Sequence, residues 1–232
     1  MAFDESTVHA IHDLYLKDVV EGFNLCPFAR RCREDDKLKR IIFWPEKAHV
    51  NSQEVGQKLS ELHDGEPIPD VLLLTFVVTE GHPWRKPEGF EEFLRELREV
   101  HQQAVKQSNK IASYYMVAFH PNLSVPAGKL NQATLVPLLR HSPDPVIQCV
   151  RAELLNEIRR QSQSRKFTYL QTKIEDSNFA LPKVFGIQTD ATISTEIARN
   201  NFLRVGSGEQ RNQLEAQISN IMQLRNQSYR QG

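Results

Sequence analysis

The amino-acid sequence predicts an α/β protein: a mainly parallel or mixed sheet of three to four strands, flanked by helices, with a helical C-terminal extension. Short apolar runs alternate along the chain with longer segments whose apolar residues recur every three or four positions, the pattern of strands joined by crossover helices. The run 71–78 is apolar without alternation, which is typical of a strand covered on both faces. A ferredoxin-like α+β fold, whose sheet contains antiparallel pairs, is the alternative.

Two helices and two strands are expected in the first third of the chain. Apolar residues at three- and four-residue steps predict a helix over about 6–21, and the segment 39–44, whose last four residues are apolar, predicts a strand. Asn51 predicts the start of a second helix, because its side-chain oxygen can accept hydrogen bonds from free backbone amides. This helix precedes the buried strand 71–78.

The middle of the chain continues this alternation. The clearest helical period spans 90–105, and the apolar run 114–119 predicts a third strand in the interior of the sheet. Pro143 fits the first turn of a further helix, because the amide hydrogen that proline lacks would be unpaired there. The apolar spacing extends this helix over 142–158.

The C-terminal part of the chain is expected to form an extension. Residues 1–165 are interpreted as an α/β domain that carries the motifs, and 166–232 as an irregular and helical extension packed on it. Within the extension we expect a short strand near 167–170 and helices near 194–203 and 209–225. The last helix has a thin apolar stripe: Leu214, Ile218, Ile221 and Leu224.

Composition argues against several classes of protein. The 232 residues carry 29 Lys and Arg against 29 Asp and Glu, so the chain lacks the basic excess typical of nucleic-acid binding. Its longest apolar run, 71–78, is far shorter than the roughly 20 residues that cross a bilayer. Three cysteines make no even disulfide set, and the acidic N-terminal segment has no apolar stretch of signal-peptide length. We expect a cytoplasmic protein with no nucleic-acid or membrane partner.

Two histidines follow predicted strands. Ligands of open α/β sheets bind beyond the carboxyl ends of the strands, where His82 follows 71–78 and His120 follows 114–119. Because imidazole exchanges a proton near neutral pH, His120 is a candidate catalytic base and His82 a candidate substrate-binding residue. The alternative for each is a loop histidine that is hydrogen-bonded to nearby backbone.

Cys26 is the candidate nucleophile or redox thiol. Arg30 and Arg31 lie close to it in the sequence, and Pro27 can begin a short helix beside the sulfur. A cation or a helix N-terminus in that place favours the thiolate, which is the reactive form. Asn24, in the same segment, is a candidate substrate-binding residue. The alternative is that Cys26 is a small buried apolar residue.

The segment before Pro143 is the candidate anion site. Backbone amides at a helix start point outward, and the helix dipole favours negative charge there. Arg140 adds a forked pair of donors, and His141 and Ser142 complete the predicted substrate-binding group. The alternative is ordinary capping of the helix by Ser142, with a solvated arginine.

No metal or cofactor is predicted from the spacing of residues. Cys26 and His120 are residue types that bind zinc, but no pair in the chain has the short spacing of a recognised zinc motif. Glycine-rich phosphate-binding motifs and the G-x-S-x-G of serine hydrolases are also missing from the sequence. A metal site that uses Cys26 and His120 stays open as an alternative.

Three segments together resemble a bacterial protein family of unknown function. They read GFNLCPFA at 22–29, AFHP at 118–121 and HSPDP at 141–145. The resemblance extends over roughly 8–160. It implies a shared structure and a shared location of the site, and it implies no particular reaction.

The resemblance favours a role for Cys26 and His120, which lie in the first two motifs. The chain departs from the family pattern at two positions. His141 stands where the family usually has arginine, and Gln148 stands where a histidine is common.

These observations lead to two hypotheses of function. The first is an enzyme that acts on a small anionic substrate, with Cys26 and His120 as catalytic groups and Arg140 in the anion site. The second is a non-catalytic binding or interaction protein, in which Cys26 belongs to the core and the final helix is a contact surface.

Overall fold

A four-stranded mixed sheet forms the centre of the molecule. Its strands are β1 (Leu38–Phe43), β2 (Val71–Phe76), β3 (Tyr114–Phe119) and β4 (Val146–Arg151). The order is β1-β2-β4-β3, in which β1 and β2 are parallel and β4 is antiparallel to both of its neighbours. The computed structural model describes residues 4–26, 28–62, 67–108, 111–128, 130–157 and 191–230, with the backbone alone for 191–196.

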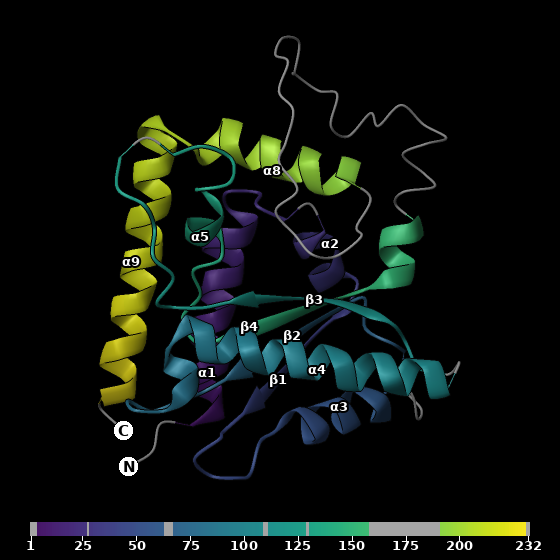
Figure 1. Cartoon of the computed structure of the whole chain (residues 1–232). Helices are drawn as coiled ribbons and strands as arrows, with labels where there is room; N and C mark the ends of the chain where they lie inside the picture. Colours follow the sequence, from purple (N-terminus) through teal and green to yellow (C-terminus); the bar gives the residue numbers. More distant parts are fainter. Residues whose placement is uncertain are drawn as a thin grey trace.

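Helices cover both faces of this sheet (Figure 1). They are α1 (Glu5–Tyr15) with its π-helical continuation η1 (Leu16–Glu21), α2 (Ala29–Glu34), α3 (Ser52–Glu61), the 3₁₀ turn η2 (Pro83–Arg85), α4 (Pro87–Gln107), α5 (Val136–Leu139), α8 (Ala191–Val205) and α9 (Gly208–Arg230). The predicted α/β fold, with a mixed sheet and C-terminal helices, is therefore confirmed. None of the helices in the described ranges is long and apolar enough to cross a membrane.

Local sequence signals account for where several helices begin. The Asp4 side chain accepts a hydrogen bond of 2.9 Å from the amide of Thr7 and so caps α1. Asn51 caps α3 in the same way, at 2.9 Å from the amide of Glu54, as its sequence position predicts. Proline occupies the first turn of α4, where no amide hydrogen is needed.

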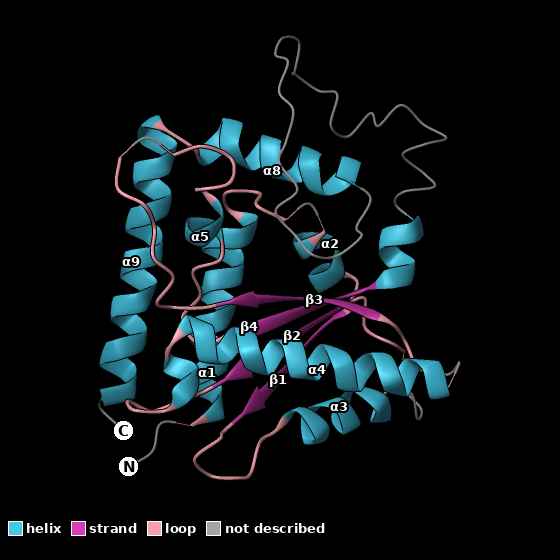
Figure 2. Ribbon diagram, viewed as in Figure 1, coloured by secondary structure: helices cyan, strands magenta, loops and turns pink. Residues whose placement is uncertain are grey.

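The sheet face under α3 and α4 is filled by aromatic side chains. The ring of Phe76, on β2, stacks on Phe43 at a centroid distance of 5.0 Å. Its edge contacts involve Phe90 at 5.4 Å and Phe93 at 5.3 Å, both on α4. Trp84 of η2 closes the cluster at 5.4 Å from Phe76. We call this surface the packed face; Figure 2 shows α3 and α4 together on this side of the sheet.

A second core joins α1 to the C-terminal helices. Ile11 of α1 and Val19 of η1 are buried in one cluster with Leu214, Ile218 and Ile221 of α9. The predicted apolar stripe of α9 is wrong at its last position, because Leu224 is 41% exposed and the neighbouring Arg225 is buried instead. The strand expected near 167–170 lies outside the described residues.

The helix predicted over 142–158 is wrong in its first half, which forms β4. Val146, Ile147 and Val150 fit a helical stripe, but they fit a buried strand equally well. Pro145 disfavours the helical region only for Asp144, which precedes it. Pairing with β2 on one side and β3 on the other makes residues 146–151 a strand. Residues 152–157 are helical.

The new strand also changes the position of β3. β4 lies between β2 and β3, so β3 is an outer strand rather than the inner one that its apolar run predicts. Its burial alternates strictly between buried and half-buried residues. The run is apolar on both faces because helices cover both faces, although one edge is unpaired.

Candidate functional site

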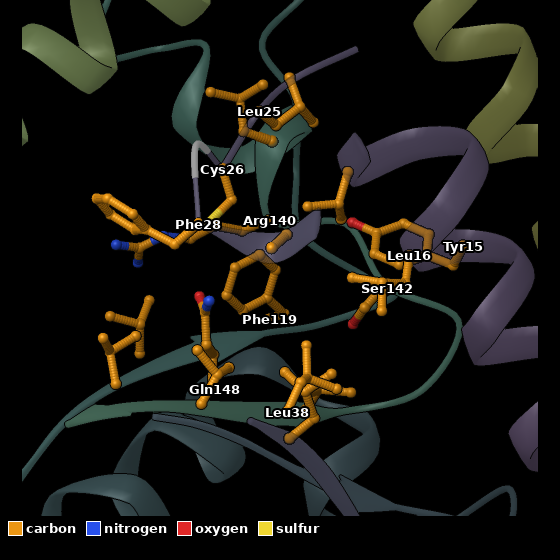
Figure 3. Close-up of a pocket in the computed structure, with 18 of the residues that line it drawn as sticks. Tyr15, Leu16, Leu25, Cys26, Phe28, Leu38, Phe119, Arg140, Ser142 and Gln148 are labelled. Atoms are coloured by element: carbon orange, nitrogen blue, oxygen red, sulfur yellow. The ribbon is translucent and has the colours of Figure 1, made fainter. Parts of the chain in front are cut away.

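A cavity of about 340 Å³ lies on the face of the sheet opposite to the packed face (Figure 3). Successive side chains of a strand point to opposite faces, so the neighbours of the packed residues point into this cavity. We call this surface the cavity face. Its main floor residues are Leu38 and Arg40 of β1, Leu73 of β2, Val117 and Phe119 of β3, and Gln148 of β4.

Helices and the segment after η1 form the rest of the wall. The apolar side chains on this side are Leu16, Val20, Leu25, Val136, Leu139 and Ile197. Few polar side chains interrupt the apolar lining. A cavity of this size, with apolar walls and a few fixed polar groups, is typical of small-molecule sites.

One part of the cavity brings together Arg140, Gln148 and Cys26. Figure 3 shows these three side chains around the same hollow, beside Phe119. The carbonyl of Arg140 accepts a hydrogen bond of 2.9 Å from the amide of His120, which places Arg140 beside the end of β3. Burial lowers the pKa of Arg140 to about 10, so the guanidinium remains positively charged at neutral pH. This end of the cavity therefore carries a cation, and the charge of Glu91 partly opposes the effect of burial on its pKa.

Cys26 lines the cavity, but its thiol is not activated. Burial raises the pKa of Cys26, and hydrogen bonds with the backbone of Phe28 and Ala29 only partly oppose this effect. The sulfur therefore remains a thiol at neutral pH, whereas a nucleophilic cysteine needs a depressed pKa.

His120 does not face Cys26. It follows the buried residues of β3 on the packed face, where its ring lies 5.9 Å from that of Phe90. Its Nδ1 accepts from the amide of Asn122 at 3.0 Å, and its Nε2 donates to the carbonyl of Trp84 at 2.9 Å. Burial lowers the pKa of His120, so a neutral imidazole satisfies both bonds. The structure does not form the expected pair of Cys26 and His120.

Three other residues expected at the site lie outside the cavity. His82 caps η2, where its Nδ1 accepts from the amide of Trp84 at 3.1 Å. Asn24 is an exposed residue with φ of 50°. The carbonyl of His141 accepts from the Tyr15 hydroxyl, while the His141 side chain is absent from the cavity lining as far as the structure describes it.

The anion site expected at a helix start before Pro143 is wrong in its mechanism. Since the segment leads into β4, it has no helix dipole and no row of outward-pointing amides. Ser142 still lines the cavity, and its hydroxyl donates to the carbonyl of Asp144 at 2.5 Å. Arg140 therefore lines the cavity without a helix start beside it.

Asp144 is the centre of a buried polar network. Its Oδ2 accepts from Nε2 of His12 at 3.0 Å and from the hydroxyl of Tyr229 at 2.7 Å. Its Oδ1 accepts from Nη2 and Nε of Arg225 at 2.6 and 3.1 Å. The network ties α1, the segment before β4 and α9 together, so it fastens the helices over the cavity face.

Burial, hydrogen bonds and neighbouring charges set the protonation states of Asp144 and His12 in this network. Burial acts to raise the pKa of Asp144, but the hydrogen bond from His12 and the charge of Arg225 outweigh it and hold this pKa below its ordinary value. Burial lowers the pKa of His12 more than the bond to Asp144 raises it. At neutral pH the network therefore consists of a carboxylate, a guanidinium and a neutral imidazole.

The lining residues that the sequence did not predict include His12, Arg40 and Gln148. Gln148 carries a signal in the sequence, because it is a polar residue within an apolar run. His12 and Arg40 carry none, since each is one polar residue within an amphipathic segment. Among the described residues, no group of three or more His, Cys, Asp or Glu side chains is placed to hold a metal ion.

Comparison with known proteins gives one match. A family model described as "Protein of unknown function (DUF1415)" matches residues 7–184. No curated protein and no solved structure matches the chain. The matched range contains Cys26, Arg140 and Gln148, whereas Arg225 and Tyr229 of the buried network lie beyond it.

Proposed function

We propose that this chain, which belongs to the family of unknown function just described, binds a small anion that has an apolar body. The observation that carries the proposal is the cavity of about 340 Å³, with apolar walls and the charged Arg140 at one end. Both halves of the ligand follow from this lining, because the walls suit hydrocarbon and the guanidinium suits an anionic group.

The apolar body of the ligand supplies the main binding energy. Leu73, Val117 and Phe119 form a hydrocarbon floor under the cavity. Each Å² of apolar surface that a ligand buries contributes about 25 cal/mol. A purely polar metabolite would leave this floor uncovered, so the lining favours an aliphatic or aromatic acid.

The anionic head of the ligand is assigned to Arg140. A guanidinium presents donors in a planar fork that matches a carboxylate, and Gln148 adds a neutral amide beside it. Hydrogen bonds to charged groups contribute about 1.5–3 kcal/mol. The head group therefore accounts for a roughly ten- to hundredfold gain in affinity.

Binding is favoured over catalysis by Cys26. The burial that raises the pKa of this thiol opposes thiolate chemistry, and His120 lies on the other face of the sheet. None of the described histidines, His120 included, is hydrogen-bonded to Cys26. Cys26 is therefore assigned to the wall of the cavity, where a thiol packs as a small apolar group.

The proposal is tested by calorimetric titration with a straight-chain monocarboxylate and the primary alcohol of the same chain length. We expect the carboxylate to bind and the alcohol to bind roughly ten- to a hundredfold more weakly. Arg140→Gln should remove this preference, while Arg140→Lys should keep part of it. Arg31→Gln, at a side chain that is 84% exposed, is the matched control. Absence of binding, or equal affinity for the two ligands, would overturn the proposal.

A further inference from the structure

The end of the cavity opposite to Arg140 carries a second pair of polar groups. Arg40 lies on β1, and β1 and β3 are the two outer strands of the sheet. Three spacings of about 4.8 Å separate these strands, or about 14 Å in all. Arg40 and the β3 end beside Arg140 therefore lie far apart along one continuous cavity.

Arg40 is a buried cation with unused donors. Its side chain is 5% exposed, and its Nη2 donates to Oδ1 of Asp13 at 3.0 Å. Its buried Nε has no hydrogen-bond partner in the described part of the chain. A guanidinium has five N–H donors, and buried donors in proteins are almost always paired. The donors of Arg40 are therefore not all paired within the described part of the chain.

His12 supplies a complementary acceptor beside Arg40. It is 2% exposed and lines the cavity. Since its Nε2 carries the hydrogen that is donated to Asp144, its Nδ1 is unprotonated and can accept a hydrogen bond. No hydrogen bond to this Nδ1 is formed by the residues that the structure describes.

The two groups lie on the same side of the cavity. Arg40 contacts Asp13, which directly follows His12 in α1, so the guanidinium lies beside this turn of the helix. The pKa of His12 agrees with this placement, because burial and then the nearby charge of Arg40 both act to lower it. Arg40 and His12 therefore line the same part of the cavity wall.

Building on the proposed function, we propose that Arg40 and His12 form a second subsite, which binds a hydroxyl group at the far end of the ligand. A hydroxyl oxygen accepts from the Arg40 guanidinium while its hydrogen is donated to Nδ1 of His12. The ligand class is then a long-chain or aromatic acid with a hydroxyl remote from its carboxylate.

Charge balance distinguishes a hydroxyl from a second carboxylate. Arg40 is paired with Asp13, and Arg225 is paired with Asp144, while His12 is neutral. A second carboxylate would bring an uncompensated negative charge and would face the lone pair of Nδ1. A hydroxyl adds no charge and satisfies both groups.

The test compares three ligands of equal carbon number in the full chain: a straight-chain monocarboxylate, its ω-hydroxy derivative and the α,ω-dicarboxylate, over a series of lengths. We expect the ω-hydroxy acid of the best length to bind roughly tenfold more tightly than the plain acid, and the dicarboxylate to gain nothing. Arg40→Met and His12→Phe should each abolish the hydroxyl preference, measured as the ratio of the affinities for the ω-hydroxy acid and the plain acid in the same variant. Arg95→Met, at a side chain that is 63% exposed, is the control.

The outcomes separate this inference from the proposed function. If the plain acid binds and the hydroxyl adds no affinity at any length, the second subsite is wrong and the function stands. If the dicarboxylate is the tightest ligand, the second subsite accepts a negative charge, and its assignment to a hydroxyl is wrong. If no ligand binds, both proposals fail. The comparison of ligands with the unaltered protein decides the matter even where a variant does not fold.

Discussion

The two faces of the sheet are formed by alternate residues of the same strands, but one face is packed and the other borders a cavity. On the packed face, rings such as those of Phe43 and Phe76 fill the space under α3 and α4. On the cavity face, the covering helices are fastened by the network around Asp144, and the space beneath them is left open. The contrast teaches that apolar packing closes one face of the sheet. On the other face, the apolar cluster between α1 and α9 and the buried bonds of Asp144 together hold the helices around a cavity.

Breaking the polar network should produce the largest effect. Arg225→Met leaves the carboxylate of Asp144 buried without its cation, and such losses cost about 3–5 kcal/mol. Denaturant unfolding would measure this change. Arg95→Met, which removes an exposed partner of Glu92, should change stability by less than about 1 kcal/mol. Equal effects of the two substitutions would mean that the network does not fasten the helices.

The adjacent residues Leu73 and Leu74 of β2 test the contrast between the faces directly. Leu74 is fully buried in the packed face, so Leu74→Ala should cost about 2–5 kcal/mol. Leu73 is half-buried and borders open space, so Leu73→Ala creates less new cavity and should cost clearly less. The comparison is made by denaturant unfolding of both variants. A larger loss from Leu73→Ala would contradict the assignment of the faces.

Stability should fall by a smaller amount as the pH is lowered. Burial lowers the pKa of both His12 and His120, so each is neutral in the folded chain. Below the ordinary histidine pKa of about 6.5, the unfolded chain binds protons that the folded chain does not. The free energy of unfolding should therefore be constant above this pH and decrease from about pH 6.5 downward. A stability that rises in this range would contradict the neutral forms.

His12 lies on the cavity face and His120 on the packed face, so substitutions at these residues measure how much each face contributes to the pH dependence of unfolding. His12→Gln and His120→Gln should each reduce the pH dependence of unfolding, because each removes one group whose folded pKa is lowered. His9→Gln, at a side chain that is 41% exposed, is the matched control for the loss of an imidazole. An unchanged slope in both buried variants would assign the dependence to other groups.

Much of the fold could be predicted from the sequence where local signals agree. The cap at Asn51, the long helical period that became α4, and the unbroken apolar run of β2 were each confirmed. The first half of the segment 142–158 was not, because its apolar spacing fits two periods, and only its pairing with β2 and β3 makes it a strand. A short apolar run does not by itself reveal whether it is a strand or a helix.

The site was harder to predict because it depends on tertiary position. The insertion of β4 between β2 and β3 decides which side chains share the cavity. His12 meets Asp144 across 132 positions of sequence, which no local pattern encodes. Cys26, Arg140 and Ser142 were identified and do line the cavity. His120, the expected partner of Cys26, follows Phe119, which lines the cavity. Because successive residues of a strand point to opposite faces, His120 points to the packed face.

A crystal structure of the protein with a bound long-chain carboxylate tests the central claim most directly. We expect a hydrocarbon chain on the floor formed by Leu73 and Val117, with the carboxylate within hydrogen-bond distance of Arg140. A ligand bound elsewhere on the molecule, or one whose head points away from Arg140 inside the cavity, would contradict it.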